Sequence, residues 1–371
     1  MRTTETSGAA AGAAPLRLGI LGCANIARQF VRDVHAHQRG ARRWVSIDAV
    51  ASRDAAKAAA FAGEFGIARH HGSYDALLAD AAVDAIYLPL PNSLHAEWAI
   101  AAAKAGKHVL CEKPLSCGLD EACAMFDAAR ENGVMLLEAY PWWFQPQTRE
   151  MLALLHGGAI GRVRSVQASF GFTMANPLTN IRLDPALGGG ALLDAGSYTL
   201  SLIRLAMGEA PLRVQADARW TDGGPVRGVD IATIATLHYA DGRHAQLSCA
   251  MDVANHRHAT IVGTQGTIET EYLNHTAGPG AVHPFGYLPS TLRVRRGIAN
   301  TVAFETVESA CGSGFGFAAE AFATIVAAGD HAAIDRAARA SIDIAATLEA
   351  IAASARNGKP VDVPVPASPR P

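Results

Sequence analysis

The stretch LRLGILGCANIA, residues 16–27, joins an apolar run to a turn of small residues. The run is typical of a buried strand, and helical periodicity starts near Ile26. Gly22, Ala24 and Ala27 stand where a dinucleotide-binding βαβ unit has its G-x-G-x-x-G/A pattern. In that pattern the first position makes a tight bend, the second admits a pyrophosphate, and the third lets the helix pack closely on the strand. We therefore expect a Rossmann unit to begin here.

The phosphate site is predicted at Gly22, Cys23, Ala24, Asn25 and Ile26. Free N–H groups and the dipole at the start of a helix favour a bound anion. Ala24 departs from the usual second glycine and adds one methyl group near the ligand. Small residues can also serve packing alone, but the complete βαβ unit that follows favours a nucleotide.

Apolar runs alternate with Ala-rich helical stretches as far as about Ala139. The expected strands are LRLGIL, WVSIDAVAS, VDAIYLPL, KHVLCEKP and VMLLEAY, and the expected helices begin near Ile26, Asp54, Asn92 or Ser93, and Leu119. This order is typical of a parallel sheet with helices on both faces. Residues 15–139 are therefore predicted to form a doubly wound α/β Rossmann domain.

Longer segments with period-two alternation follow Tyr140. They are VRSVQASFGF, VDIATIATLHYA, HAQLSCAMDVA, HATIVG and TLRVRRG. Such segments suit an antiparallel or mixed sheet with one solvated face. Helical periodicity follows the Gly-Gly-Gly run and returns near 315–328 and 332–353. Residues 140–371 are thus predicted to form an α+β domain with an open, largely antiparallel sheet, and residues 1–14 are interpreted as a disordered tail.

The charge balance gives no reason to expect nucleic acid or a membrane as a partner. The chain carries 34 acidic and 32 basic side chains and has no basic run, so nothing favours binding to nucleic acid or to an anionic membrane surface. No apolar run is long enough to span a bilayer. The six cysteines form no CxxC pair and no His/Cys cluster at zinc spacing, so no metal is predicted. A cytoplasmic protein with a small-molecule function is expected.

A Glu-Lys-Pro turn follows the strand KHVLC. The carboxyl ends of parallel strands are where α/β folds bind ligands, so Lys113 is placed to face a nicotinamide. Pro114 restricts the preceding residue to an extended backbone, which fixes the direction of the lysine side chain. A solvated lysine at a strand end is the competing interpretation.

Asp194 and Tyr198 lie four residues apart in the predicted helix after the glycine run, so they share one face. A tyrosine can pass a proton to or from a substrate oxygen while Lys113 stabilises charge on that oxygen. The aspartate would orient the substrate or the tyrosine. This trio predicts hydroxyl oxidation or carbonyl reduction. The competing interpretation is a capping aspartate beside a packed tyrosine.

The residues after the second strand predict the cofactor. NAD-binding Rossmann domains carry an acid there that bonds to the ribose hydroxyls, whereas this chain has Ser52 and Arg53. Serine can donate to a phosphate oxygen, and arginine offers a planar charged fork. Asp48 lies within the strand, and Asp54 is expected to cap the next helix. NADP(H) is therefore predicted in preference to NAD(H).

At these motifs the chain resembles the glucose–fructose oxidoreductase / inositol dehydrogenase / MocA (Gfo/Idh/MocA) family. The resemblance runs from about Leu16 to Val363, through GILGCANIA, AVASR, VDAIYLPLPNSLHAEWAIAAAKAGKHVLCEKPLS, EAYPWWFQPQ, IGRVRSVQASF and NIRLDPALGGGALLDAGSYTLSLIRL. The most similar branch holds NADP-dependent xylose and dihydrodiol dehydrogenases, glucose–fructose oxidoreductase and nucleotide-sugar 3-ketoreductases. The resemblance implies a substrate site between the two domains, with a sugar or cyclic diol as substrate.

The resemblance also implies roles for single residues. It places the family lysine on Lys113, the proton-handling residue on Tyr198 and the substrate-contacting aspartate on Asp194. It implies that residues 89–95 pack on the cofactor, with His95 near the nicotinamide end. The predicted cofactor site thereby gains a further set, namely Leu90, Pro91, Asn92, His95, Glu112 and Lys113.

Two further expectations rest on the resemblance. The exposed face of the second domain's sheet is expected to join copies of the chain into a homodimer or homotetramer. The aromatic cluster departs from the commoner family form, so it is interpreted either as a stacking wall for a pyranose or aromatic ring or as core. This cluster consists of Tyr140, Trp142, Trp143 and Phe144.

Two other functions stay open beside the dehydrogenase. An NAD-dependent glycosidase would oxidise a sugar transiently and release free sugar without net cofactor turnover. A non-catalytic NADP-sensing protein would bind the cofactor and turn over nothing, although the presence of Lys113, Asp194 and Tyr198 argues against it.

Overall fold

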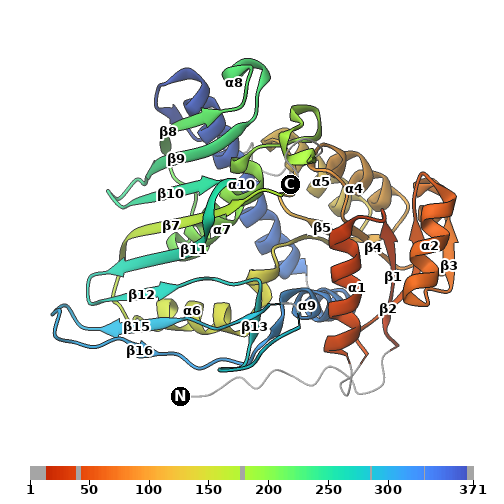
Figure 1. The fold of residues 1–371 in the computed structure, drawn as a ribbon, viewed down its shortest axis with the longest axis horizontal. Coiled ribbons are helices and arrows are strands. Elements are labelled where there is room, and N and C mark those ends of the chain that lie inside the picture. The colour runs from red at the N-terminus through yellow and green to blue at the C-terminus, as the bar shows by residue number, and fades with distance from the viewer. Residues whose placement is uncertain (1–13, 39–42, 176–179, 285, 330, 366–371) are drawn as a thin grey trace.

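The computed structural model describes residues 14–38, 43–175, 180–284, 286–329 and 331–365. Figure 1 shows a helix-covered parallel sheet beside a large, mostly antiparallel sheet. The predicted tail falls almost wholly outside the described residues. Both sheets agree with the predicted fold class.

The Rossmann sheet has six strands in the order β3-β2-β1-β4-β5-β6, and all its pairs are parallel. Its strands are β1 (Leu16–Leu21), β2 (Val45–Ala51), β3 (Arg69–His71), β4 (Ala85–Leu88), β5 (His108–Glu112) and β6 (Leu136–Ala139). Its helices are α1 (Asn25–His37), α2 (Ala55–Phe65), α3 (Tyr74–Leu78), α4 (His95–Lys104) and α5 (Leu119–Glu131). The short elements β3 and α3 had no separate sequence signal.

One face of this sheet is covered by helices from both ends of the chain. Leu18 and Ile20 of β1 are fully buried in one apolar cluster with Phe30 of α1. The same cluster contains Phe315 and Phe322 of α9 (Gly314–Ala328). The C-terminal part of the chain therefore returns to pack on the Rossmann sheet.

The large sheet has nine strands in the order β16-β15-β12-β11-β7-β10-β9-β8-β18. Only the pair of β7 and β10 is parallel among the pairs described. Its strands are β7 (Val163–Thr173), β8 (Arg213–Trp220), β9 (Asp230–His238), β10 (His244–Ala250), β11 (Asp252–Gly263), β12 (Gly266–Thr270), β15 (Arg293–Arg296), β16 (Glu305–Thr306) and β18 (Val361–Asp362). The prediction of an open, largely antiparallel sheet is confirmed.

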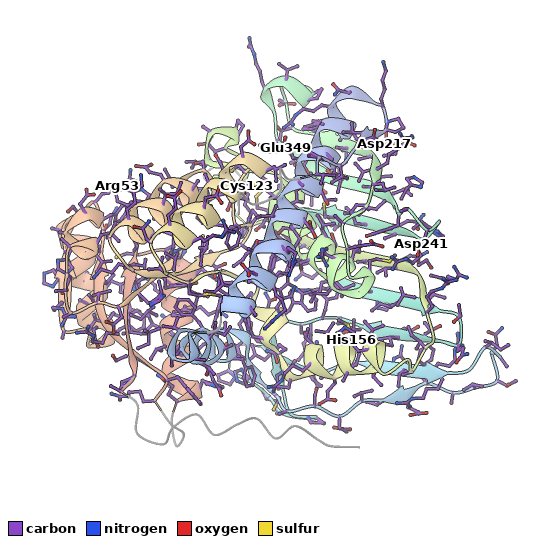
Figure 2. The ribbon with its side chains drawn as sticks, turned by 180° about the vertical axis from the view of Figure 1, so that it is seen from behind. Arg53, Cys123, His156, Asp217, Asp241 and Glu349 are labelled. Atoms are coloured by element: carbon purple, nitrogen blue, oxygen red, sulfur yellow. The ribbon has the colours of Figure 1, made fainter. Side chains whose placement is uncertain are left out.

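The other elements of this part are helices on one face and a small sheet. The small sheet has the order β14 (Leu288–Pro289), β13 (His275–Ala277) and β17 (Gly312–Ser313), and the helices are α6 (Pro146–His156), α7 (Ser197–Met207), α8 (Gly224–Arg227) and α10 (His331–Asn357). Figure 2 shows α10 running between the Rossmann helices and the large sheet. The opposite face of the large sheet is open, and Ile234 there is 57% exposed.

A π-helical turn precedes α7 where the sequence predicted a regular α-helix. Residues Leu192–Gly196 form this wider turn. Gly190 before it has a φ of +115°, and a β-carbon there would overlap the carboxylate of Asp230. That carboxylate accepts a hydrogen bond from the amide of Leu192 at 2.7 Å. The glycine run thus lets a buried acid fix the start of the turn that carries Asp194.

Within the described ranges, no helix combines the length and apolar character needed to cross a bilayer. The same residues contain no cluster of three His, Cys, Asp or Glu side chains arranged to hold a metal ion. All six cysteines are free thiols.

Candidate active site

The predicted phosphate loop connects β1 to α1. Gly22 has a φ of +119°, and a β-carbon there would lie 2.8 Å from the side chain of Leu90. Only glycine fits this position without strain. Ala24 caps α1 without any side-chain hydrogen bond, and the first turn of the helix contains no acid. Its first amides can therefore bind an anion, as the pyrophosphate of a dinucleotide requires.

Ser52 and Arg53 follow the end of β2. Ser52 is buried, and its hydroxyl oxygen accepts from the amide of Asp54 at 3.2 Å, which leaves its hydrogen available to another acceptor. Arg53 is exposed on the outer surface of the Rossmann part (Figure 2) and forms no ion pair within the described residues. Asp54 accepts from the amides of Ala56 and Lys57 at 3.0 and 3.1 Å, so it caps α2 as expected.

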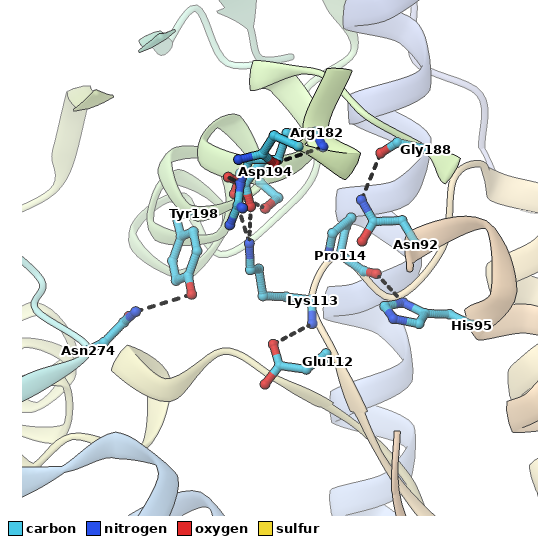
Figure 3. Close-up of polar contacts among 12 residues, drawn as sticks. Asn92, His95, Glu112, Lys113, Pro114, Arg182, Gly188, Asp194, Tyr198 and Asn274 are labelled. Carbon is cyan, nitrogen blue, oxygen red and sulfur yellow. Dashed lines mark hydrogen bonds and ion pairs between the residues drawn. The ribbon is translucent and has the colours of Figure 1, made fainter. Parts of the chain in front are cut away.

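His95 ties the predicted cofactor loop to the Glu-Lys-Pro turn. Its side chain is fully buried, with Nδ1 2.9 Å from the carbonyl oxygen of Pro114 and Nε2 2.9 Å from that of Leu90. Pro91 begins the short 3₁₀ turn Asn92–Leu94 that leads into α4. Asn92 donates to the carbonyl oxygen of Gly188 at 2.8 Å, which links the two domains (Figure 3). These side chains fix the path of the loop.

Glu112 lies at the end of β5 and is buried. It accepts a hydrogen bond from the hydroxyl of Tyr87 at 2.7 Å and one from the amide of Lys113 at 3.3 Å. Burial raises the pKa of this carboxyl. The peptide bond between Lys113 and Pro114 is cis. Glu112 therefore holds the backbone of the turn through the amide of Lys113. The side chain of Lys113 extends toward the second domain.

Lys113 meets the π-helical turn directly. Its Nζ donates to Oδ1 of Asp194 at 2.8 Å and to the carbonyl oxygen of the same residue at 3.0 Å. It also lies 4.7 Å from the centre of the Tyr198 ring (Figure 3). Burial alone would lower the pKa of Lys113, but the Asp194 carboxylate raises it, so the ammonium form persists.

Asp194 is held between two cations. Nε of Arg182 donates to its Oδ2 at 2.6 Å, opposite the contact with Lys113. Burial would raise the pKa of Asp194, but Lys113 and Arg182 lower it to about 2. The carboxylate is therefore ionised at every pH at which enzymes usually work. The sequence stretch NIRLDPALGGG contains Arg182, but nothing in its spacing showed that it would reach Asp194.

Tyr198 is 6% exposed and lies next to Lys113. Nδ2 of Asn274 donates to its hydroxyl oxygen at 3.1 Å, and Asn274 Oδ1 is buried with no partner among the described residues. Gln145 holds the Asn274 loop by donating to its carbonyl oxygen at 2.6 Å. Burial raises the pKa of Tyr198, and the positive charges of Lys113 and Arg257 oppose that rise.

The aromatic cluster belongs mainly to the core. Tyr140 and Trp142 are fully buried, and Trp142 donates to the hydroxyl of Ser201 at 3.0 Å. Tyr140 meets the Tyr198 ring edge-on at 5.5 Å, and Trp143 packs 4.7 Å from Tyr140. Phe144 packs against the Rossmann cluster. The cluster thus packs against Tyr198 through the ring of Tyr140 and fixes the position of the tyrosine.

The three residues predicted to carry the chemistry converge at one sheet edge, between a nucleotide-type fold and a second domain. Sequence reasoning missed Arg182, Asn274 and Arg257, which complete their surroundings. A phenol, an ammonium and an ionised carboxylate beside a dinucleotide loop define a dinucleotide-dependent oxidoreductase.

Comparison with known protein families agrees with this class of enzyme. Residues 16–140 match the model described as "Oxidoreductase family, NAD-binding Rossmann fold", and residues 148–269 match the "GFO/IDH/MocA C-terminal domain". The chain belongs to the Gfo/Idh/MocA family of oxidoreductases, which confirms the resemblance seen in the sequence.

Several relatives extend over most of the chain. D-xylose 1-dehydrogenase (NADP(+)) 2 of Haloferax volcanii is 37% identical over 349 residues, which cover 94% of this chain and 100% of the relative. A 3-ketoreductase from Actinomadura kijaniata, crystallised with NADP and TDP-benzene, has a TM-score of 0.78 at 31% identity and covers 92% of this chain and 98% of its own. Aldose-aldose oxidoreductase from Caulobacter crescentus, complexed with glycerol, has a TM-score of 0.80 at 26% identity, over 94% and 100% of the two chains.

Proposed function

We propose that this protein is an NADP-dependent oxidoreductase that transfers a hydride between the nicotinamide and a hydroxyl or carbonyl carbon of a sugar or related cyclic polyol. The observation that carries the proposal is the convergence of Lys113, Asp194 and Tyr198 at the carboxyl end of β5. The relatives that are named for xylose, for a dihydrodiol and for a keto-sugar support the substrate class.

Bound NADP supplies or accepts the hydride, and the chain's own residues handle the proton. In oxidation, Tyr198 takes the proton from the substrate hydroxyl; in reduction, it returns that proton to the carbonyl oxygen. The Lys113 ammonium stabilises negative charge on the phenol oxygen and on the substrate oxygen. Asp194 is fixed by Arg182 and orients both the lysine and the substrate.

The cofactor would be held mainly by backbone and small residues. The phosphate loop from Gly22 to Ile26 would bind the pyrophosphate, and Ser52 with Arg53 would bind the 2′-phosphate. The loop of Leu90, Pro91 and Asn92 would cover the nicotinamide half. His95 and Glu112 would act on the cofactor through the backbone that they hold, because their polar atoms are bonded inside the protein.

The test is a spectrophotometric screen of aldoses, keto-sugars and cyclic diols with NADP(H) and NAD(H). The proposal expects absorbance change in proportion to product, with the phosphorylated cofactor preferred. Release of free sugar from a glycoside without net NADP(H) turnover would support the glycosidase. NADPH binding without turnover of any compound in the screen would support a sensor.

We also propose that the chain forms a homodimer or homotetramer through the open face of the large sheet. Ile234 projects from this face among polar side chains such as Gln246 and His258. Ile234→Asp should shift the protein to a smaller species in light scattering, whereas Ile298→Asp, at an 85% exposed site in the turn between β15 and β16, should not. An unchanged mass in the first variant would contradict the interface. The cytoplasmic location stays a prediction from cysteine usage.

A further inference from the structure

Arg257 of β11 points into the candidate site, and no carboxylate of the described chain forms an ion pair with it. Its guanidinium carbon lies 4.4 Å from the ring centre of Tyr198, 4.4 Å from that of Tyr272 and 4.8 Å from that of Phe170. Three aromatic rings therefore enclose a cation that has no counter-ion in the part of the chain that the structure describes.

The three rings around Arg257 leave two of its hydrogen-bond donors without an acceptor in the described part of the chain. Nε and Nη2 of Arg257 are buried and form no hydrogen bond with any described residue. The hydroxyl of Tyr272 beside them donates to the carbonyl oxygen of Ser169 at 2.9 Å. Tyr272 also has a φ of +37°, which is strained for a residue other than glycine. Buried charge and backbone strain are costly, and they concentrate where function requires them.

Because Nε and Nη2 are covered by protein, these donors cannot reach a substrate directly. The nearest group whose charge state they can influence is the phenol of Tyr198. A positive charge beside a phenol favours its ionised form, just as Lys113 does from 4.7 Å. Two cations thus contact the ring of the residue that handles the proton.

The other groups around Tyr198 do not supply positive charge to its phenol. Glu112 opposes ionisation of the phenol, and Asn274 only donates a hydrogen bond to it. Asp194 is paired with both Lys113 and Arg182, and Arg204 of α7 is paired with Asp343 of α10. The buried groups on the packed elements have raised pKa values and are neutral, namely Tyr87, Tyr140, Tyr272 and Cys249.

We propose that Arg257 is a positioning residue that favours the phenolate form of Tyr198 and so prepares it to accept a proton from the substrate. It acts on the tyrosine ring, and its Nε and Nη2 are covered by protein and do not reach the substrate. The proposal rests on the proposed role of Tyr198. Burial makes the phenolate costly, and Arg257 offsets that cost together with Lys113.

The test is an ultraviolet titration of Tyr198 in the full-length protein without added ligand. The spectrum of Tyr198→Phe is subtracted from that of the wild type at each pH, so that only this phenol remains. The same subtraction is made in the background of Arg257→Met, and circular dichroism limits the range to pH values at which every variant is folded. Arg257→Gln is a second neutral variant should the methionine variant not fold. Arg257→Lys retains the charge.

The expected result is a Tyr198 pKa raised by about one unit in Arg257→Met or Arg257→Gln, which means tenfold less phenolate at a given pH. Arg257→Lys should stay close to the wild type. Arg295→Met is the matched control, because Arg295 also covers an aromatic ring, that of Phe304 at 4.9 Å, and also has a buried Nε without a partner. It should not change the Tyr198 titration.

The proposal is overturned if neutral variants leave the titration unchanged, if the lysine variant behaves like them, or if Tyr198 does not ionise in folded wild type. Turnover separates this failure from that of the proposed function. If Tyr198→Phe retains full turnover, the role of Tyr198 is wrong. If it loses turnover while Arg257→Met leaves the titration unchanged, only the role of Arg257 is wrong.

Discussion

The two edges of the candidate site are built in different ways. The cofactor edge is local, because the phosphate loop occupies residues 22–26 and consists of backbone groups and small side chains. The substrate edge brings together charged and polar side chains from distant segments, namely Lys113, Arg182, Asp194, Tyr198, Arg257 and Asn274. Binding at the phosphate loop depends on space, and chemistry at the substrate edge depends on a balance of charges.

The largest effect is expected from Tyr198→Phe, which removes the proton-handling oxygen from the substrate edge. Turnover should fall at least about a hundredfold, as for other lost acid–base groups. Affinity for NADPH, measured by fluorescence titration, should stay within about twofold because the phosphate loop is untouched. Lys113→Met should behave similarly. Near-normal turnover in both variants would show that another group moves the proton.

A smaller effect is expected on stability from Glu138 of β6, whose buried carboxylate accepts from the amide of Leu115 just after the lysine turn at 2.8 Å. Burial raises the pKa of Glu138 from 4.5 to about 7. A raised folded-state pKa gives stability below pH 4.5 that is lost as the pH rises toward 7. Glu138→Gln should abolish this loss, which amounts to at most about 3 kcal/mol.

Thermal unfolding from pH 4 to 8 checks the Glu138 prediction. The melting temperature of the wild type should fall relative to that of Glu138→Gln as the pH rises. Glu131→Gln, at an exposed carboxylate at the end of α5, is the control and should follow the wild type. Parallel curves for the wild type and Glu138→Gln would mean that burial does not raise the pKa of Glu138.

At the cofactor edge, Gly22→Ala should weaken NADPH binding by about tenfold or more. The positive φ and the approach of Leu90 leave no room for a β-carbon, and backbone strain costs about 1–3 kcal/mol. Turnover at saturating cofactor should change little. Gly63→Ala in α2, where a β-carbon meets nothing, is the control. Equal affinities in the two variants would show that the loop does not approach the cofactor.

A still smaller effect is expected from Arg53→Ala, which removes the fork proposed to bind the 2′-phosphate. The ratio of kcat/KM for NADP(H) to that for NAD(H) should fall about tenfold, which is about 1.4 kcal/mol, as for one charged hydrogen bond. Arg43→Ala, before β2, is a control. A wild type that prefers NAD(H), or an unchanged ratio in Arg53→Ala, would remove Arg53 from the cofactor site.

The difference between the edges also explains what the sequence could predict. The phosphate loop, the capping role of Asp54 and the doubly wound sheet follow from local patterns, because each depends on neighbours in the chain. Asp194 and Tyr198 were predicted on one helix face, and both contact Lys113. Their shared direction was local information too.

The remaining parts of the site had no local signal. Asn274 lies 76 residues after Tyr198, and Arg257 lies on a strand whose alternation only says which face it takes. The π-helical turn depends on Asp230, which is 38 residues beyond the amide that it accepts from. Such contacts are set by tertiary packing, so spacing along the chain does not predict them.

The central claim, that space controls the phosphate loop and charge controls the substrate edge, is tested most directly by one paired measurement. NADPH affinity and turnover at saturating cofactor, with the best substrate from the screen, are measured on the same preparations of Tyr198→Phe and Gly22→Ala. The account predicts that the first loses at least about a hundredfold in turnover at unchanged affinity, and that the second loses at least about tenfold in affinity at nearly unchanged turnover. Loss of affinity in Tyr198→Phe together with loss of turnover alone in Gly22→Ala would contradict it.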